Sequence, residues 1–157
     1  MSPRGFSAKR AGSRVRADSD QAVRSLAQLR YALRKFLRFS ENAARDCGVT
    51  PQQHQLMLGV AGYTGRNSAT VSELAEFLQE RNQSVVGLVE RAAQNGLVRR
   101  AQNSKDRRVV IVSLTPRGEN ILLMLTKLHQ EEIRRISEVW DIRKFPKVFP
   151  ERDAKTG

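Results

Sequence analysis

Two short amphipathic helices followed directly by a basic hairpin, between Ala69 and Leu114, constrain the fold of this chain more than any other feature. Thr70 and Glu73 have the spacing of a capping box, which predicts that the first helix begins there. A tight connection over residues 79–82 leads to the second helix, which Asn95-Gly96 is expected to end. Apolar residues recur at helical spacing in both helices: Val71, Leu74, Ala75 and Leu78, then Val85, Leu88, Val89 and Ala92. Each helix is therefore expected to bury one face and expose the opposite one.

The hairpin is predicted from two β-rich runs, residues 97–100 and 109–114, which flank a polar stretch over residues 101–108. Asp106 is its only acidic residue, against the basic residues Arg99, Arg100, Lys105, Arg107 and Arg108. A charged turn of this kind is usually no more than solvated. After a helix pair, however, it favours a wing that contacts the minor groove of DNA. The segment as a whole predicts a winged helix-turn-helix, whose second helix enters the major groove.

The outward face of the second helix holds the residues expected to contact DNA. Gln83 can read adenine, and Val86 can contact a thymine methyl group. Glu90 is unfavourable near phosphates, which suggests that only the N-terminal half of the helix enters the groove. Gly87 costs about 1 kcal/mol relative to alanine inside a helix, and either packing or close approach to DNA could compensate. The predicted DNA-binding residues are Arg81, Asn82, Gln83, Ser84, Val86, Gly87, Arg91, Arg100, Lys105, Arg107 and Arg108, with Asp106 supporting the wing.

Longer amphipathic helices are expected on both sides of this unit, over about residues 20–47 and 116–140. Between the first of them and the helix pair, Thr50 and Gln53 form a second capping box, which predicts a helix that runs to about Tyr63. The last long helix is apolar on several faces, and a monomer would cover it poorly. We therefore expect the long helices to pack against a second copy; burial within one subunit is the alternative.

These elements predict one mainly α domain with a small β wing, over residues 19–140, in which the DNA-binding lobe spans about residues 50–114. Residues 1–18 are rich in Arg, Lys, Gly and Ser, and we expect them to form a disordered basic arm. Residues 141–157 are expected to form a poorly ordered tail.

The charge of the chain favours a polyanionic partner, because 28 Lys and Arg residues oppose 16 Asp and Glu residues and give a net charge of +12. Nucleic acid, an acidic membrane surface or simple solubility would each fit this charge alone. The chain lacks an apolar run of the roughly 18 residues that span a bilayer, and it lacks a secretory signal, so we expect a cytoplasmic protein that is not in a membrane. The single cysteine, Cys47, continues an apolar stripe and is interpreted as a small buried residue rather than a redox sensor.

Catalytic and metal-binding patterns are missing from the sequence. It has two histidines, His54 and His129, without a neighbouring cluster of Cys, Asp or Glu, so no metal site is predicted. We find neither a nucleophile with its base nor a glycine-rich phosphate loop, so neither an enzyme nor a cofactor is expected. His54, Met57 and Tyr63 are candidates to line a pocket for a small aromatic effector, although core packing explains them equally well.

Four runs in this sequence resemble the MarR (multiple antibiotic resistance regulator) family: LVER at residues 88–91, NGLVRR at 95–100, KDRR at 105–108 and VSLTPRG at 112–118. The resemblance covers roughly residues 22–140. It departs from the family at Ala92 and Ala93, where Leu and a charged residue are more common. It departs also at Val86 and Gly87, where hydroxyl and basic residues are common.

The resemblance implies a homodimer with interleaved terminal helices and two winged modules set against successive major grooves of duplex DNA. Family wings carry Asp-x-Arg, which Asp106 and Arg108 match; this implies that Arg108 enters the minor groove while Asp106 holds its guanidinium group. The expected function is a ligand-responsive repressor on a palindromic operator. A protein that coats nucleic acid without sequence preference is the alternative.

Overall fold

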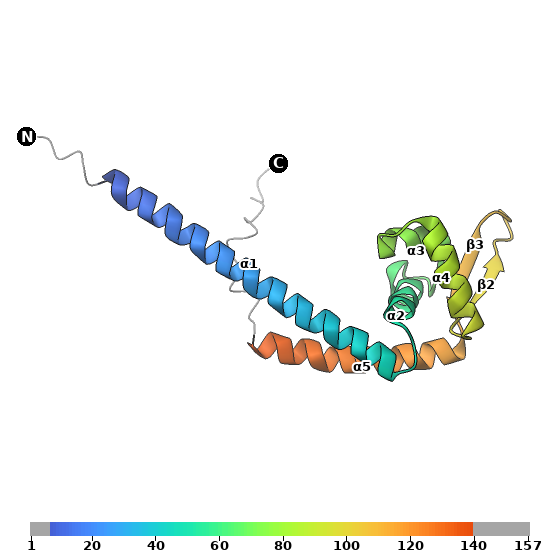
Figure 1. Ribbon diagram of the computed structural model, residues 1–157. Helices are drawn as coiled ribbons and strands as arrows, with labels where there is room; N and C mark the ends of the chain where they lie inside the picture. Colours follow the sequence, from blue (N-terminus) through green and yellow to red (C-terminus); the bar gives the residue numbers. More distant parts are fainter. Residues whose placement is uncertain (1–6, 140–157) are drawn as a thin grey trace, which may run out of the picture. The chain divides into compact units, whose positions relative to one another are not determined.

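The computed structural model describes residues 7–139, and the chain divides into two units. The central unit is Arg38–Glu131, and the terminal unit combines Met1–Leu37 with Glu132–Gly157. In chain order the elements are α1 (Ser7–Asp46), α2 (Pro51–Leu58), the π-helical turn η1 (Gly59–Tyr63), β1 (Ser68–Thr70), α3 (Val71–Leu78), α4 (Asn82–Gln94), β2 (Val98–Gln102), β3 (Val110–Leu114) and α5 (Pro116–Val139) (Figure 1). No helix within the described residues has both the length and the apolar character that crossing a membrane requires.

Both predicted capping boxes are confirmed, and they fix the starts of α2 and α3. At α3 the Thr70 hydroxyl accepts a hydrogen bond from the Glu73 backbone at 3.2 Å, while the Glu73 carboxylate accepts one from the Thr70 backbone at 2.8 Å. Thr50 and Gln53 exchange the same pair of bonds at the start of α2, each at 3.1 Å. The backbone bond from Thr70 and the guanidinium group of Arg66, at 2.6 Å, hold the pKa of Glu73 below its usual value. The start of each helix is therefore determined by a four-residue segment, from the N-cap threonine to the third residue of the helix.

Thr70→Ala should lower the free energy of unfolding by about 1 kcal/mol, because the Glu73 N–H at the start of α3 loses its hydroxyl acceptor. Urea denaturation monitored by circular dichroism would measure the change. Ser72→Ala, at an exposed position in the same helical turn, is the matched control and should be nearly neutral. A Thr70→Ala protein with the unfolding midpoint of the wild type would show that the cap contributes nothing.

A three-stranded antiparallel sheet, ordered β1-β3-β2, contains the predicted hairpin. Arg100 of β2 and Ala69 of β1 both pair with Val112, at the centre of β3. Gly96 has a φ of +67° and ends α4 in the left-handed conformation, as expected. β1 and η1 are additions to the predicted fold.

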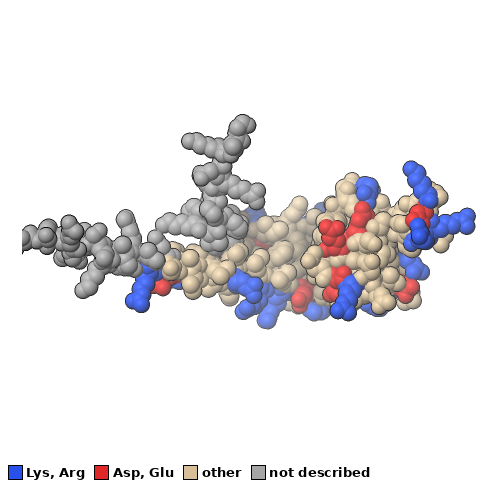
Figure 2. Space-filling view, turned by 90° about the horizontal axis from the view of Figure 1, so that it is seen from above, with Lys and Arg blue, Asp and Glu red and all other residues tan. Residues whose placement is uncertain are grey.

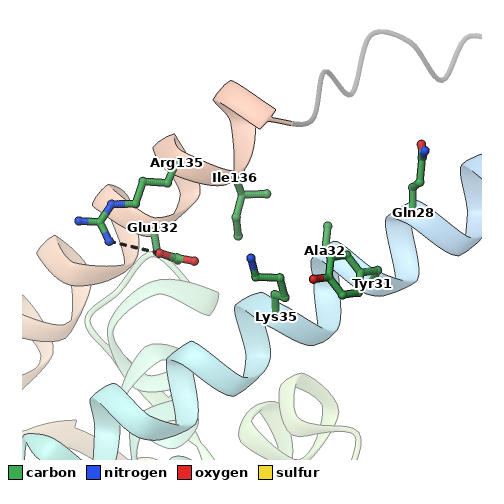
Figure 3. Close-up of a pocket in the computed structure, with 7 residues that line it drawn as sticks. All are labelled: Gln28, Tyr31, Ala32, Lys35, Glu132, Arg135 and Ile136. Atoms are coloured by element: carbon green, nitrogen blue, oxygen red, sulfur yellow. Dashed lines mark ion pairs between the residues drawn. The ribbon is translucent and has the colours of Figure 1, made fainter.

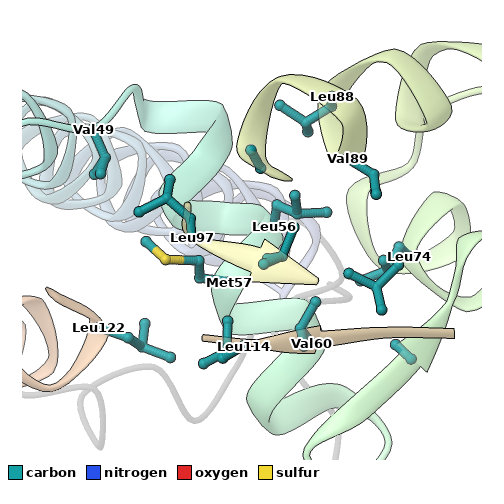
Figure 4. Close-up of a cluster of buried hydrophobic side chains, with 14 of the residues drawn as sticks. Val49, Leu56, Met57, Val60, Leu74, Leu88, Val89, Leu97, Leu114 and Leu122 are labelled. Atoms are coloured by element: carbon teal, nitrogen blue, oxygen red, sulfur yellow. The ribbon is translucent and has the colours of Figure 1, made fainter. Parts of the chain in front are cut away.

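The core of the central unit lies where α2, α3 and α4 meet the sheet and the first half of α5 (Figure 4). Leu56, Leu74 and Leu125 are fully buried, and they come from α2, α3 and α5. Cys47 is half-buried and packs against the same cluster, as interpreted from the sequence. Because α5 contributes both Leu122 and Leu125, the central unit is not complete without this helix.

The expected disordered arm over residues 1–18 requires a correction, because α1 begins at Ser7 rather than near residue 20. Residues 7–19 contain no proline, and adding residues to an existing helix requires no new nucleation, so the basic composition does not prevent helix formation. Residues 1–6 and the predicted tail over residues 141–157 lie outside the described residues.

An exposed apolar stripe runs along α1 in the terminal unit. Leu26 and Leu33, seven residues apart and so on one face of the helix, are 52% and 48% exposed, and Val23 and Leu37 extend the same stripe. In the central unit, α5 exposes Leu123, Met124 and Leu128. Exposed apolar side chains in rows on long helices are typical of helices that meet a further partner.

Candidate nucleic-acid interface

Helix α4 presents a polar face, as predicted from its apolar spacing. Val85 and Val89 on the inner face are 1% exposed, and Ala92 is fully buried. Gly87 is half-buried, and the other predicted residues on the helix and at its start are exposed: Arg81, Asn82, Gln83, Ser84, Val86 and Arg91. In contrast to α2 and α3, no side chain of the described chain caps α4, although Arg81 occupies the N-cap position in an extended conformation. Its first-turn N–H groups are therefore able to bind an anion.

The tip of the β2–β3 hairpin holds Arg108 in a defined orientation. Its Nε and Nη2 atoms lie 3.2 and 3.4 Å from the two carboxylate oxygens of Asp106, and its backbone N–H donates to the same carboxylate at 3.0 Å. These bonds from Arg108 lower the pKa of Asp106, which is therefore ionised at neutral pH. The Arg108 side chain is nevertheless 91% exposed. Its guanidinium group is thus fixed in direction and open to a partner, as the Asp-x-Arg match implied.

Basic side chains project from the hairpin end of the central unit (Figure 2). Lys105 and Arg107, beside Arg108, are exposed as well. With Asp106 neutralised by Arg108, this tip carries a net positive charge. Such a tip attracts the phosphates that line the minor groove.

Arg100 and Glu90 form an ion pair that the sequence analysis did not foresee, with Arg100 Nη1 3.4 Å from Glu90 Oε1. The pair joins the strand β2 to the helix α4. It also changes the interpretation of both residues: Glu90 is neutralised by a neighbour, and Arg100 is partly committed within the protein. Because both side chains are about half exposed, the pair contributes about 0–1 kcal/mol and can rearrange on contact with a polyanion.

The three residues proposed for an effector pocket have different surroundings in the described part of the chain. Met57 is fully buried in the core, and Tyr63 is exposed and packs against Phe77 of α3, with ring centroids 5.2 Å apart. His54 is buried with its ring centroid 4.8 Å from that of His129. Burial, and to a lesser degree the neighbouring His129, lower the pKa of His54 to about 4, so it is neutral at physiological pH. Core packing, the alternative that we considered for these residues, accounts for His54 and Met57.

His129 is held by two hydrogen bonds at the meeting point of α1, α2 and α5. Its Nδ1 donates to the carbonyl oxygen of Leu125 at 2.6 Å, and its Nε2 is hydrogen-bonded to the Ser40 hydroxyl at 2.7 Å. Phe39 contacts the ring edge-on, with centroids 5.6 Å apart. The described residues contain no group of three or more His, Cys, Asp or Glu side chains that could hold a metal ion. The two histidines therefore belong to a packed polar cluster in the core.

A cavity of about 510 Å³ lies within the terminal unit, between α1 and the end of α5 (Figure 3). Tyr31 and Lys35 line it from α1, while Ile136 and the ion pair of Glu132 with Arg135, at 3.7 Å, line it from α5. Its volume falls within the range of pockets that bind small molecules. The sequence gives no sign of this cavity because its walls come from segments about a hundred residues apart in the chain.

Residues 48–109, which include α2, the helix pair and most of the hairpin, match the family model described as the MarR family. This segment of the chain is therefore similar to the MarR family. Members of this family regulate transcription and are not enzymes, as expected here from the sequence. The match includes Asp106 and Arg108 at the tip of the wing.

Two curated relatives and one solved structure illustrate how far the likeness extends. The HTH-type transcriptional repressor MdtR of Bacillus subtilis is 38% identical over 72 residues, which are 46% of this chain and 44% of that protein. The transcriptional activatory protein BadR of Rhodopseudomonas palustris is 29% identical over 80 residues, 51% of this chain and 46% of that protein. The chain thus matches about half the length of these relatives. The MarR family transcription regulator SP03579 has a TM-score of 0.70 at 24% identity, with 82% of this chain and 83% of that chain covered, which confirms the winged-helix fold.

Proposed function

We propose that this protein is a DNA-binding transcription regulator that acts as a homodimer on a palindromic duplex site. The observation that carries the proposal is the wing, where Asp106 orients an Arg108 side chain that is 91% exposed. An arginine fixed in this way loses little side-chain freedom when it binds, and its guanidinium group suits a narrow minor groove. The polar face of α4, with an N-terminus that no side chain of the described chain caps, supplies the major-groove element beside it.

The homodimer is supported by the exposed apolar residues of the long helices. Leu26 and Leu33 on α1 are each about half exposed, and Leu123 on α5 is 60% exposed. A symmetric dimer would bury such residues and would place two winged modules on half-sites about 10 base pairs apart. This arrangement accounts for long helices that a winged module alone does not need. Acting on DNA in this way, the protein would work in the cytoplasm.

More specifically, we propose that the protein represses transcription and that a small aromatic effector relieves this repression. Repression is supported by the likeness to a relative named as a repressor. The cavity in the terminal unit is a better candidate for the effector than the buried residues His54 and Met57. Isothermal titration with small aromatic acids, followed by DNA-binding assays at saturating acid, would test the response. Acids that bind without changing DNA affinity would contradict it.

Selection of bound fragments from a random duplex library tests the proposed function directly. We expect enrichment of one inverted repeat, with affinity that falls as salt rises. Equal binding to every duplex at physiological salt would instead indicate a protein that coats nucleic acid without sequence preference.

Arg108→Ala should weaken binding to the selected duplex by about 1–3 kcal/mol, because one oriented minor-groove contact is lost. Fluorescence anisotropy would measure the affinity, and sedimentation would show an unchanged oligomeric state. The matched control is Arg45→Ala, which removes an exposed arginine that is paired with Glu41 at 3.5 Å on α1. An Arg108→Ala protein that binds as tightly as the control would refute the role of the wing.

A further inference from the structure

Gly87 lies in the middle of α4, where glycine destabilises a helix relative to alanine. Within the chain, packing does not explain its presence. A Cβ built on Gly87 would approach one group, the Nη1 atom of Arg91, at 3.3 Å. Arg91 is exposed, and its guanidinium group is the far end of a flexible side chain, so it can move by a few tenths of an ångström. Alanine would therefore fit at this position in the isolated protein.

Gly59 shows what a packing glycine looks like in this molecule. A Cβ there would lie 2.8 Å from Cδ1 of Phe77 and 3.0 Å from Cδ2 of Leu74, inside a filled core. Nothing comparable surrounds Gly87. Of the two explanations that the sequence leaves open, packing and close approach of a partner, the contacts thus favour the partner.

Gly87 opens into a groove of about 580 Å³ between α2 and α4. Gln52 and Gln55 line it from α2, and Gln83, Ser84 and Arg91 line it from α4. These side chains provide several hydrogen-bond donors and one positive charge, and the guanidinium group of Arg91 makes no ion pair with a carboxylate in the described part of the chain. Glu80 is the one carboxylate in the lining. The groove is therefore polar and rich in hydrogen-bond donors, and at Gly87 the backbone of α4 has no side chain of its own to cover it.

The shape of this surface distinguishes the two parts of DNA that could enter it. Base edges lie at the floor of the major groove, about 8.5 Å deep, and are reached by side chains that protrude. A sugar–phosphate backbone is a convex ridge, and it fits a concave surface whose donors can bind phosphate oxygens. We infer that the groove receives the backbone of one DNA strand, with the strand in contact with the helix at Gly87 and a phosphate bound by Arg91. This inference rests on the proposed function and makes Gly87 a determinant of affinity rather than of base preference.

Gly87→Ala tests the contact, because the same methyl group should have opposite effects on folding and on binding. The melting temperature should rise by roughly 2–4 °C, since alanine favours the helix. Affinity for the selected duplex and for an unrelated duplex should fall by the same factor, about tenfold, because the backbone ridge is present in both. The matched control is Gly62→Ala, at an exposed helical glycine where a Cβ meets no atom within 4 Å, and it should leave both affinities unchanged.

Arg91→Gln adds a second, independent readout. Loss of one phosphate contact should reduce the slope of log affinity against log salt by about 0.9, on both duplexes. If Gly87→Ala binds both duplexes as tightly as the wild type, or loses affinity for the selected duplex alone, the proposed backbone contact is wrong. If the melting temperature of Gly87→Ala is lower than that of the wild type, packing explains the glycine instead. None of these outcomes would contradict the proposed function as long as the wild type binds its selected duplex. A wild type that binds no duplex would refute the proposed function and this contact with it.

Discussion

Gly118→Ala should lower the free energy of unfolding by about 3 kcal/mol, although it adds a single methyl group. Gly118 is buried in the first turn of α5, and a Cβ built there overlaps the carbonyl oxygen of Leu97. That oxygen accepts a hydrogen bond from the backbone of Thr115 at 3.1 Å, and the Leu97 side chain is 1% exposed in the core. The backbone can relieve the overlap only by breaking these contacts, so the loss should be large.

Urea denaturation would measure this effect, and the melting temperature should fall by roughly 6–12 °C. Gly62→Ala is again the matched control, because the open surroundings of Gly62 accept a Cβ. Its stability should be equal to or slightly above that of the wild type. Equal midpoints for Gly118→Ala and wild type would show that α5 can shift away from Leu97 at little cost, and that the packing of this helix start is loose.

Leu26→Glu combined with Leu33→Glu should convert the dimer to a monomer and weaken binding to a palindromic duplex by about a hundredfold or more. Both side chains are about half exposed in the protomer, so the protomer itself should fold normally. In a dimer interface, however, the two carboxylates would be buried without partners. With the dimer lost, each winged module binds its half-site alone and the avidity of the linked pair disappears.

Sedimentation equilibrium at micromolar protein would measure the oligomeric state, and circular dichroism would confirm that the helices are retained. The control pair Gln21→Glu and Asn42→Glu adds the same charge to exposed polar positions of α1, outside the apolar stripe. We expect the control to remain a dimer and to lose little affinity. A double leucine variant that stays dimeric would refute the role of this stripe in dimerisation.

Sequence alone predicted the features whose causes are local. The capping boxes at Thr50 and Thr70 place the starts of α2 and α3 because each needs only residues within one helical turn. The hairpin follows from two β-rich runs with a short polar connection. β1 was missed because it has three residues and exists only through pairing with β3, more than forty residues later in the chain. Composition does not locate the start of α1, because basic residues can extend an existing helix as well as form a disordered arm.

The residues of the candidate site show the same difference between local and long-range interactions. Asp106 and Arg108 are two residues apart, and a family motif identified them before their geometry was known. The ion pair of Glu90 with Arg100 joins a helix to a strand, and no periodicity in the sequence indicates it. The contact of His129 with Ser40, 89 residues away, likewise depends on how α1 and α5 pack. Interactions between elements, unlike those within them, required the structure.

The open surroundings of Gly87 also have an evolutionary consequence. Every glycine codon is a single-base change away from a codon for alanine. The resulting protein would fold at least as well, because nothing rigid among residues 7–139 opposes the added methyl group. Selection for stability alone would therefore not keep glycine at this position. With the proposed contact and function, a lineage could adjust how tightly the protein holds DNA by a single mutation, without losing its fold or its preferred sequence.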